Sequence, residues 1–379
     1  MKSLKTLRWR REARLFPATG GNSFQLLSGG KEYFPALLKA IAEARHEVLV
    51  ECYVWSDDDT GRAVLEAAAA AARRGIAVML CLDGVGGFGA RQTAEKILAG
   101  TGGVVAVFNP VRFRPWFRRW YERNHRKIAV IDGATAFIGG FGFRNDWYEF
   151  SPAGRWDIGA RVSGPVAGQC RRAFAHDWFR STRRYLPPGR EPAKAREGGE
   201  SLRLLPSVLG RRDLLRNLRN SIGNARKRAY ICTTYFIPSL RLRHALRRAA
   251  RRGVDVRLLL PSPPREAPAF IFAGRRHYHS LLAAGVRIFE YQPAFIHAKY
   301  AVVDRDWGYI GSSNLDNWSG RFNLEADLET LSPGSVQALE GRFLMDLEDS
   351  REISLERWRN RSIWMKLMER IFGWIDPLL

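Results

Sequence analysis

A short motif that occurs twice in this chain limits the folds open to it more than any other feature. The motif is His-x-Lys-x4-Asp, and its two copies begin at His125 and His297, 172 positions apart. Each copy is followed by a turn of mostly small residues, Gly139 to Gly142 in the first and Gly311 to Asn314 in the second. The sequences upstream of the two motifs are also similar, so we predict two related halves.

Apolar runs alternate with amphipathic helical stretches in both halves, and this pattern predicts an α/β architecture. A stretch rich in proline, glycine and charge, residues 183–200, is predicted to link the halves. The complete predicted organisation is a basic N-terminal segment at 1–19, a first domain at 20–182, the linker at 183–200, a second domain at 201–350 and a basic amphipathic tail at 351–379.

The strong positive charge of the chain predicts a polyanionic partner. There are 61 lysines and arginines against 38 aspartates and glutamates, which gives a net charge of +23. Nucleic acid and an anionic membrane surface both fit this charge, which does not distinguish them. The N-terminal residues lack the apolar stretch of a signal peptide, and no run has the length of a transmembrane helix. Any membrane contact is therefore expected to be peripheral.

The spacing of the residues within each motif fits a β-strand. Residues 125–131 and 297–303 are predicted strands, and the two-residue period of a strand places the histidine and the lysine of each motif on one face. The following glycine turn would bring backbone N–H groups near a phosphate. If the halves associate about a pseudo-twofold axis, both His/Lys pairs face one cleft.

Two histidines and two lysines in one cleft suit the cleavage of a phosphodiester without a metal ion or cofactor. One imidazole attacks phosphorus and forms a covalent phosphohistidine. The other protonates the leaving oxygen and then deprotonates the acceptor. The lysines, Asn314 and backbone amides offset the charge on the non-bridging oxygens. We favour His125 as the nucleophile and His297 as the acid/base, although the sequence is nearly symmetric on this point.

The residues around both motifs resemble the phospholipase D superfamily, and within it the bacterial cardiolipin synthase branch, particularly its B type. The resemblance is carried by RNHRKIAVIDG followed by AFIGG, by FIHAKYAVVD followed by GSSNLD, by GGKEYFPALLKAIAEARHEVLVECYVW and by VFNP. It covers roughly residues 20–350. It implies two homologous domains, each with a mostly parallel or mixed sheet flanked by helices, around one shared active site. It also implies transfer of a phosphatidyl group from phosphatidylglycerol or a related phospholipid to an alcohol.

The motifs and the resemblance together define the predicted site. The predicted catalytic group consists of the motif residues His125, Lys127, Asp132, His297, Lys299 and Asp304. The predicted phosphate-binding residues are Asn314, Ser312, Gly139 and Gly140, and no metal ligand is predicted. For the two motif aspartates, turn formation is favoured over direct catalysis. The family usually has asparagine where this chain has Gly142, so one phosphate or turn contact is missing, or Asn145 supplies it.

Two further carboxylates follow the motifs at places where the family carries an acidic residue. They are Asp157 and Glu325. A carboxylate bonded to one ring nitrogen would fix the tautomer of a catalytic histidine. The alternative is a surface salt bridge with one of the many arginines. The two alternatives stand evenly for Asp157, and the histidine-orienting role is favoured for Glu325.

Two stretches of the sequence indicate what kind of partner the chain binds. Residues 111–121 interleave arginines with aromatic residues, a pattern found at anionic lipid interfaces, at stacking sites for single-stranded nucleic acid and in ordinary amphipathic caps. In the tail, one helical stripe is apolar: Ile363, Trp364, Leu367, Met368, Ile371, Phe372 and Ile375. This stripe fits either an interfacial helix or a helix docked on the core.

Three functional hypotheses follow. The first is a phosphatidyltransferase of the cardiolipin synthase type, bound peripherally to the cytoplasmic side of the bacterial inner membrane, with a phospholipid donor, an alcohol or phospholipid acceptor and no obligate protein partner. The second is hydrolysis at the same site by a phospholipase or a nuclease, since only acceptor positioning and water exclusion separate transfer from hydrolysis. The third is a non-enzymatic binding protein, which the intact motifs in both halves argue against. Nucleic acid is a less favoured partner than the membrane.

Overall fold

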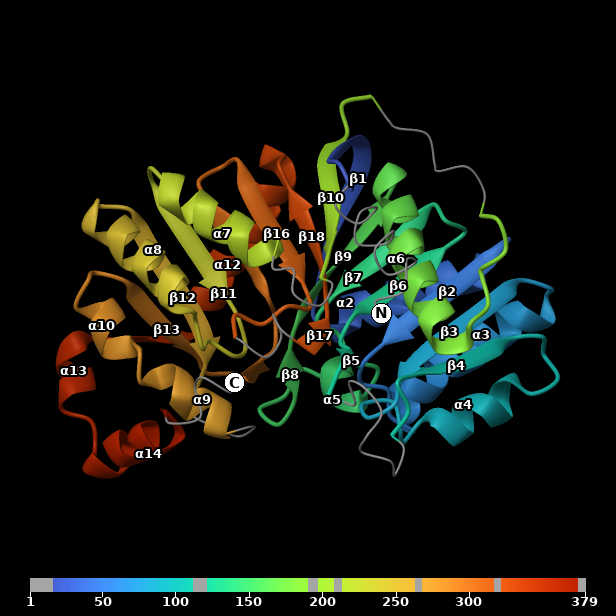
Figure 1. The fold of residues 1–379 in the computed structure, drawn as a ribbon, viewed down its shortest axis with the longest axis horizontal. Coiled ribbons are helices and arrows are strands. Elements are labelled where there is room, and N and C mark those ends of the chain that lie inside the picture. Colours follow the sequence, from blue (N-terminus) through green and yellow to red (C-terminus); the bar gives the residue numbers. More distant parts are fainter. Residues whose placement is uncertain are drawn as a thin grey trace, which may run out of the picture.

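The computed structural model describes residues 16–111, 121–189, 197–207, 213–262, 268–316 and 322–373 (Figure 1). The first half contains β1 (Thr19–Ser28), α2 (Gly30–Ala42), β2 (Glu47–Cys52), α3 (Asp59–Arg73), β3 (Ala77–Asp83), α4 (Arg91–Leu98), β4 (Val104–Phe108), β5 (Arg123–Asn124), β6 (Lys127–Ile131), β7 (Thr135–Gly139), α5 (Asn145–Tyr148), β8 (Arg155–Trp156), β9 (Ile158–Ser163) and α6 (Pro165–Thr182).

The second half contains β10 (Glu200–Pro206), α7 (Asp213–Asn224), β11 (Arg228–Cys232), α8 (Leu240–Arg251), β12 (Asp255–Pro261), α9 (Pro268–Arg275), α10 (Tyr278–Leu282), β13 (Arg287–Tyr291), β14 (Phe295–Ile296), β15 (Tyr300–Val303), β16 (Trp307–Gly311), β17 (Asn323–Leu324), β18 (Ala326–Thr330), α12 (Pro333–Glu348), β19 (Ser350–Ile353), α13 (Leu355–Arg359) and α14 (Ile363–Gly373).

One mixed sheet runs through both halves. Its order is β19-β13-β12-β11-β15-β16-β18-β10-β1-β9-β7-β6-β2-β3-β4. The order on one side of the β1–β10 pair repeats on the other side, and β19 is added at one edge. In each half three strands are parallel, and the motif strand, β6 or β15, pairs antiparallel with the first of them. The predicted α/β fold with two related halves and a mixed sheet is confirmed.

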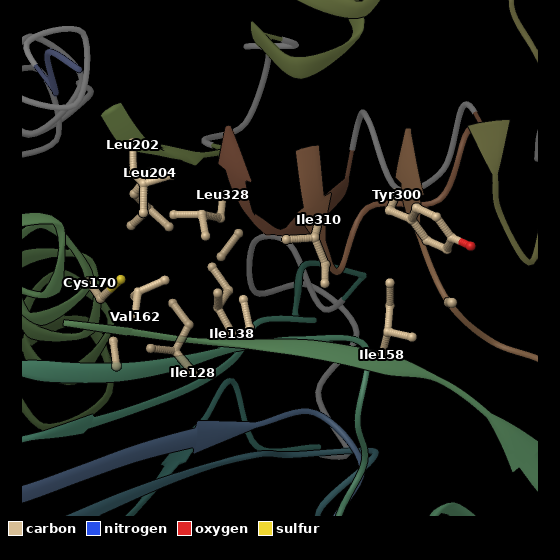
Figure 2. Close-up of a cluster of buried hydrophobic side chains, with 14 of the residues drawn as sticks. Ile128, Ile138, Ile158, Val162, Cys170, Leu202, Leu204, Tyr300, Ile310 and Leu328 are labelled. Carbon is tan, nitrogen blue, oxygen red and sulfur yellow. The ribbon is translucent and has the colours of Figure 1, made fainter. Parts of the chain in front are cut away.

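The main hydrophobic core lies between the two halves (Figure 2). Ile128 of the first motif strand and Ile138 of the next strand contribute from one side, and Tyr300 and Ile310 contribute from the other. Alternate residues of the motif strands point away from this core, so that Ala129 lies in the outer core of the first half. This alternation is the one that the period of a strand predicts. Packing of both motif strands on one core fixes the halves against each other.

The outer helices form because their sequences favour helices and offer an apolar face. Helix α3 is rich in alanine, the best helix former, and Asp58 caps its N-terminus by accepting a hydrogen bond from the Gly61 amide at 3.0 Å. Helix α3 packs on β3, and its buried alanines share the outer core with β2, whose near-continuous apolar run is typical of a strand covered on both faces. In the second half Ser239 caps α8 in the same way.

The described C-terminal residues pack against the second half. Strand β19 pairs antiparallel with β13 at the edge of the sheet, and α14 packs on α9.

The basic-aromatic stretch lies mostly outside the described residues, as do much of the linker, most of the N-terminal segment and Ile375. The domain boundaries stay a prediction. Within the parts of the chain that the structure describes, no helix is both long enough and apolar enough to span a bilayer.

Candidate active site

Two short strand pairs that cross between the halves build the site. Strand β5 pairs in parallel with β17, and β14 pairs in parallel with β8. In the first pair Asn124 is opposite Leu324, so the next residues, His125 and Glu325, come side by side. In the second pair the same register places His297 beside Asp157. Each histidine therefore lies next to a carboxylate of the opposite half.

The ring of His125 is held by Glu325. Its Nδ1 lies 2.9 Å from Oε2 of Glu325, and its backbone amide donates to the Leu324 carbonyl at 2.9 Å. The same Oε2 accepts a hydrogen bond from the Ser312 hydroxyl at 2.6 Å. The ring of Tyr53 lies 4.8 Å from that of His125. These contacts fix the ring and leave its Nε2 as the nitrogen without a carboxylate partner.

The ring of His297 is held by Asp157 in a related but not identical way. Its Nδ1 lies 2.7 Å from Oδ2 of Asp157, and its amide donates to the Trp156 carbonyl at 2.7 Å. The indole N–H of Trp147 donates to the same Oδ2 at 3.0 Å, and the Trp147 ring meets the His297 ring edge-on at 5.1 Å. Asp157 is fully buried and contacts the histidine, whereas the alternative hypothesis placed it in a surface salt bridge.

The two lysines are buried beside the histidines. Lys127 donates to the backbone carbonyl of His125 at 2.8 Å, and its Nζ lies 5.5 Å from the centre of the Tyr53 ring. Lys299 donates to the hydroxyl of Thr234 at 2.8 Å and to the backbone carbonyl of His297, and its Nζ lies 3.0 Å from the His297 Nδ1. Both ammonium groups are therefore fixed toward the histidines.

Burial and mutual charge lower the pKa values of both histidines. Burial lowers the pKa of His125 well below its ordinary value, and the positive charges of Lys127 and Lys299 lower it further. Burial also lowers the pKa of His297 well below its ordinary value, followed by the charges of Lys299, Arg155, Lys127 and His125. Each histidine therefore senses the charges of both motifs, as expected if the two motifs share one site.

The carboxylates and lysines of the site are shifted toward their neutral forms. Burial raises the pKa of Glu325 to about 7 against the opposing charge of Lys127, and burial raises the pKa of Asp157. Burial lowers the pKa of Lys127, and it lowers that of Lys299 to about 7. Glu325 and Lys299 therefore gain or lose charge near neutral pH, which is common in sites that transfer protons.

The first glycine turn leaves room for a carboxylate. A Cβ on Gly140 would lie 2.4 Å from the Asp157 carboxylate, and one on Gly139 would lie 2.6 Å from the Ile158 carbonyl. In the second half Ser312 uses its hydroxyl on Glu325 and its amide on the Ala326 carbonyl. Gly140 and Ser312 therefore lie against the two carboxylates, and the predicted phosphate contacts of Gly139, Gly140 and Ser312 stay a prediction.

The position of the missing asparagine is filled by a tryptophan. A Cβ on Gly142 would lie 3.0 Å from the ring of Trp147, the side chain that binds Asp157. Asn145 does not replace the asparagine, because its side-chain oxygen accepts a hydrogen bond from the Thr60 amide at 2.9 Å. In the second half Asn314 is buried, and its Oδ1 has no hydrogen-bond partner among the described residues.

The two motif aspartates lie at the other end of the motif strands, which corrects their assignment to the catalytic group. The histidines precede β6 and β15, whereas Asp132 and Asp304 follow them. The carboxylate of Asp132 accepts from the amides of residues 45–47 at 2.7–3.2 Å, and that of Asp304 accepts from residues 226–228 at 2.8–3.0 Å. Both have positive φ, 55° and 52°, and so form the turns.

Comparisons with known proteins agree with this geometry. The family described as "Cardiolipin synthase, PLD-like domain" matches residues 37–178 and 218–347. The chain belongs to this family. Cardiolipin synthase A of Pseudomonas putida KT2440 is 35% identical over 371 residues, which cover 96% of this chain and 76% of that protein. Cardiolipin synthase 2 of Bacillus cereus is 33% identical and is covered to 70% by the matched region.

The resemblance to phospholipase-D-type cardiolipin synthases is therefore confirmed, and the protein is an enzyme of this superfamily, a phosphatidyltransferase. The finer resemblance to the B type stays a prediction. Solved structures support the fold. A phosphatidylserine synthase from Haemophilus influenzae superimposes on this chain with a TM-score of 0.73 at 15% identity, and the superposition covers 98% of the synthase chain. A polyphosphate kinase from Porphyromonas gingivalis shares the fold over 49% of its length, with a TM-score of 0.61.

Sequence reasoning missed several residues of this synthase-family site. Tyr53 and Thr234 lie just beyond β2 and β11 and contact Lys127 and Lys299, respectively. The internal repeat could have found them, since both follow the apolar strand that precedes a motif. No sequence signal indicated Trp147. Among the described residues, no cluster of three or more histidines, cysteines and carboxylates has an arrangement that could hold a metal ion.

Proposed function

We propose that the protein transfers a phosphatidyl group from phosphatidylglycerol or a related phospholipid to an alcohol acceptor through a covalent phosphohistidine. The observation that carries the proposal is the exchange of carboxylates between the halves, which gives the site two oriented histidines. The Nδ1 of each histidine lies within 2.9 Å of a buried carboxylate oxygen, and two buried lysines lie beside them. This set of groups matches the needs of two-step phosphoryl transfer.

The surroundings of the two rings favour His125 as the nucleophile. The only charged group within hydrogen-bonding distance of its Nδ1 among the described contacts is the carboxylate of Glu325. Nδ1 then carries the proton, and Nε2 keeps its lone pair for attack on phosphorus. The lowered pKa keeps this ring neutral at physiological pH. The Nδ1 of His297 lies 2.7 Å from the Asp157 carboxylate, so an Nδ1–H of this ring is stabilised there. The negative charge of a bound phosphodiester favours a second proton on Nε2, and this doubly protonated ring suits a general acid.

In the first step the Nε2 of His125 forms a bond to phosphorus and the bond from phosphorus to the donor's headgroup oxygen breaks. The doubly protonated ring of His297, whose Nδ1–H faces Asp157, gives its Nε2 proton to this oxygen and becomes neutral, so the headgroup leaves as a neutral alcohol. In the second step His297 takes the proton of the acceptor hydroxyl, whose oxygen attacks phosphorus. The N–P bond breaks and both histidines return to their starting states.

Two features stabilise charge during these steps. Lys127 and Lys299 lie buried beside the histidines, where a positive charge acts strongly on the non-bridging phosphate oxygens. The side-chain NH2 group of Asn314 is a further candidate for a direct phosphate contact, since it can donate to a phosphate oxygen and the residue is buried beside the site. A phospholipid donor and the net charge of +23 together support a peripheral position on the cytoplasmic side of the bacterial inner membrane.

Product analysis tests the proposal. Purified protein is incubated with phosphatidylglycerol vesicles in the presence of a chelator, beside the variants His125→Ala and His297→Ala. Wild type is expected to produce cardiolipin and glycerol, and samples quenched with detergent denaturant at neutral pH should contain an acid-labile phosphatidyl adduct that the His125→Ala variant lacks. Phosphatidic acid as the only product would assign hydrolysis instead of transfer. Absence of both products would refute the proposal for this donor and move the search to nucleic acid.

A further inference from the structure

Large apolar side chains are exposed along the edge of the molecule that carries the histidines. The parallel strands β3, β4 and β11 end at this edge. Exposed apolar residues follow each of them: Val85 and Phe88 after β3, Val111 after β4, and Leu240 after β11. In Figure 1 this edge is the lower one, where α14, α9, α5 and α4 follow one another from left to right and β8 and β5 lie near α5. Single exposed apolar residues need no explanation, but several on the edge of the active site form a surface.

Helix α14 contributes the largest part of this surface. Ile363, Trp364, Leu367 and Ile371 are exposed, with 83% of Ile363 and 66% of Trp364 accessible to solvent. Their spacing of one, four and eight positions places them on one side of a helix. Only another part of the apolar face is used for docking, where Phe372 stacks on Phe272 of α9 with ring centres 5.9 Å apart. The core contact therefore leaves an apolar stripe, residues 363, 364, 367 and 371, in solvent.

The stripe is one helix away from the catalytic lysine. Helix α14 packs on α9, and the side chain of Arg276, just after α9, donates to the carbonyl of Gly373. On the other side of α9, the ring of Phe270 lies 5.0 Å from that of Tyr235. The preceding residue, Thr234, accepts the hydrogen bond of Lys299. Because α9 joins the stripe to the site, a surface bound by the stripe would lie beside the site.

Positive charge flanks the stripe. The exposed charged residues of α13 and α14 are Arg357, Arg359, Lys366, Arg370 and Glu356. The second carboxylate of this region, Glu369, is buried in an ion pair with Arg361 and adds no exposed negative charge. A helix with an apolar stripe, cationic flanks and a tryptophan has the composition of one that lies in a membrane interface.

We propose that the exposed stripe of α14, together with the apolar residues after β3, β4 and β11, is the surface through which this protein lies on an anionic phospholipid bilayer. Helix α14 would lie along the interface with its stripe among the acyl chains and its cations among the phosphates. The active-site edge then faces the headgroups, where a phosphodiester can enter. The inference rests on the proposed function in so far as a lipid donor is drawn from that bilayer.

Site-specific labelling tests the orientation directly. The four native cysteines are buried, so Trp364→Cys can carry an environment-sensitive fluorophore. Leu331→Cys is the matched control, because Leu331 is an exposed apolar residue that follows β18 at the opposite edge of the sheet. Addition of phosphatidylglycerol vesicles is expected to shift emission to the blue at position 364 and not at 331. A shift at neither position, at both, or at 364 without lipid as protein concentration rises would overturn the proposal, the last because a second copy would then cover the stripe.

A pair of double variants separates docking from chemistry. Leu367→Gln with Ile371→Gln is expected to weaken vesicle binding about tenfold or more, whereas Val104→Gln with Leu331→Gln, at the opposite edge, should bind like wild type. Both should retain wild-type activity on a short-chain phosphatidylglycerol that is soluble as a monomer. Equal vesicle binding by both variants would overturn the surface assignment. A wild type that docks through α14 but transfers no phosphatidyl group would refute the proposed function alone.

Discussion

Replacing Glu325 with glutamine should remove the orientation of His125 while preserving the packing of the site. The carboxylate lies 2.9 Å from the His125 Nδ1, and it also accepts the Ser312 hydroxyl at 2.6 Å. Glutamine keeps an oxygen for Ser312 but loses the negative charge. It can also turn its NH2 group toward Nδ1, and this would move the ring proton to the nitrogen that must attack phosphorus.

The expected loss follows from these contacts. A hydrogen bond to a charged group contributes about 1.5–3 kcal/mol, and each 1.36 kcal/mol is a factor of ten in rate, so the lost charge alone lowers kcat about 10- to 150-fold. The wrong tautomer lowers it further, and we expect a total of about 10²- to 10⁴-fold, the upper end being the cost of the comparable change in a serine protease triad. KM should change much less, since Glu325 acts through the histidine and not on the lipid.

The pH profile gives a readout that a purely structural role would not change. Burial raises the pKa of Glu325 to about 7, so its carboxylate is protonated below that pH and ionised above it. Because the pKa of His125 lies well below its ordinary value, the histidine remains neutral in this range. Activity of the wild type should therefore fall as pH drops through about 7, and the Glu325→Gln variant should lack this acidic limb.

Asp327→Asn is the matched control for this change. Asp327 is buried in the same strand region, burial raises its pKa to about 7 as well, and it accepts the Ser313 hydroxyl at 2.6 Å. Its hydrogen-bond partners among the described residues do not include either histidine. This variant should retain the acidic limb and most of the activity. A Glu325→Gln enzyme with less than a tenfold loss, or with an unchanged acidic limb, would refute the orienting role.

Three further predictions concern the other side of the site. Burial lowers the pKa of Lys299 to about 7, so the positive charge of this side chain is lost as pH rises. Wild-type activity should therefore decline above about pH 7. The Lys299→Arg variant, though slower, should not show this decline, because its guanidinium stays protonated. Trp147→Phe removes the N–H that binds Asp157 at 3.0 Å and should lower kcat about 5- to 30-fold in steady-state assays, with circular dichroism unchanged. Gly140→Ala places a methyl group 2.4 Å from Asp157 and should lower both kcat and Tm, whereas Gly341→Ala, with open space at its Cβ, should lower neither.

The fold could be predicted well from the sequence because it is encoded twice. The repeated motif, its glycine turns and the alternation of apolar strands with helices recur in both halves, so each half supports the assignment of the other. The boundaries were less exact. The motif strands begin at Lys127 and Tyr300, later than predicted, and each histidine lies in the irregular stretch before its strand. The reason lies outside the local sequence, since the amides of both histidines bind carbonyls of the opposite half.

The same limit applies to the site. Residue type and spacing indicated the histidines and the lysines, because these are chemical requirements that each half must satisfy. The two carboxylates were indicated by the family resemblance, with a surface salt bridge as an equal alternative for Asp157. The pairing of His125 with Glu325, and of His297 with Asp157, depends on the register of two strand pairs between the halves. No local pattern encodes that register. Trp147 escaped prediction for a similar reason, since its N–H binds a carboxylate ten positions away only because Gly142 leaves space for its ring.

The exchange of carboxylates also joins the two halves into one site, and the groups that support the carboxylates differ between the halves although their folds match. Each histidine takes its orientation from the opposite half, so a change in one half alters the environment of the catalytic residue in the other. Ser312 supports Glu325, whereas Gly140, at the corresponding place of the first half, leaves the support of Asp157 to Trp147. A hydroxyl on one side and an indole on the other give the two rings different donors. Such a difference can separate a nucleophile from an acid/base within a repeated fold, and neither half alone would carry an oriented histidine.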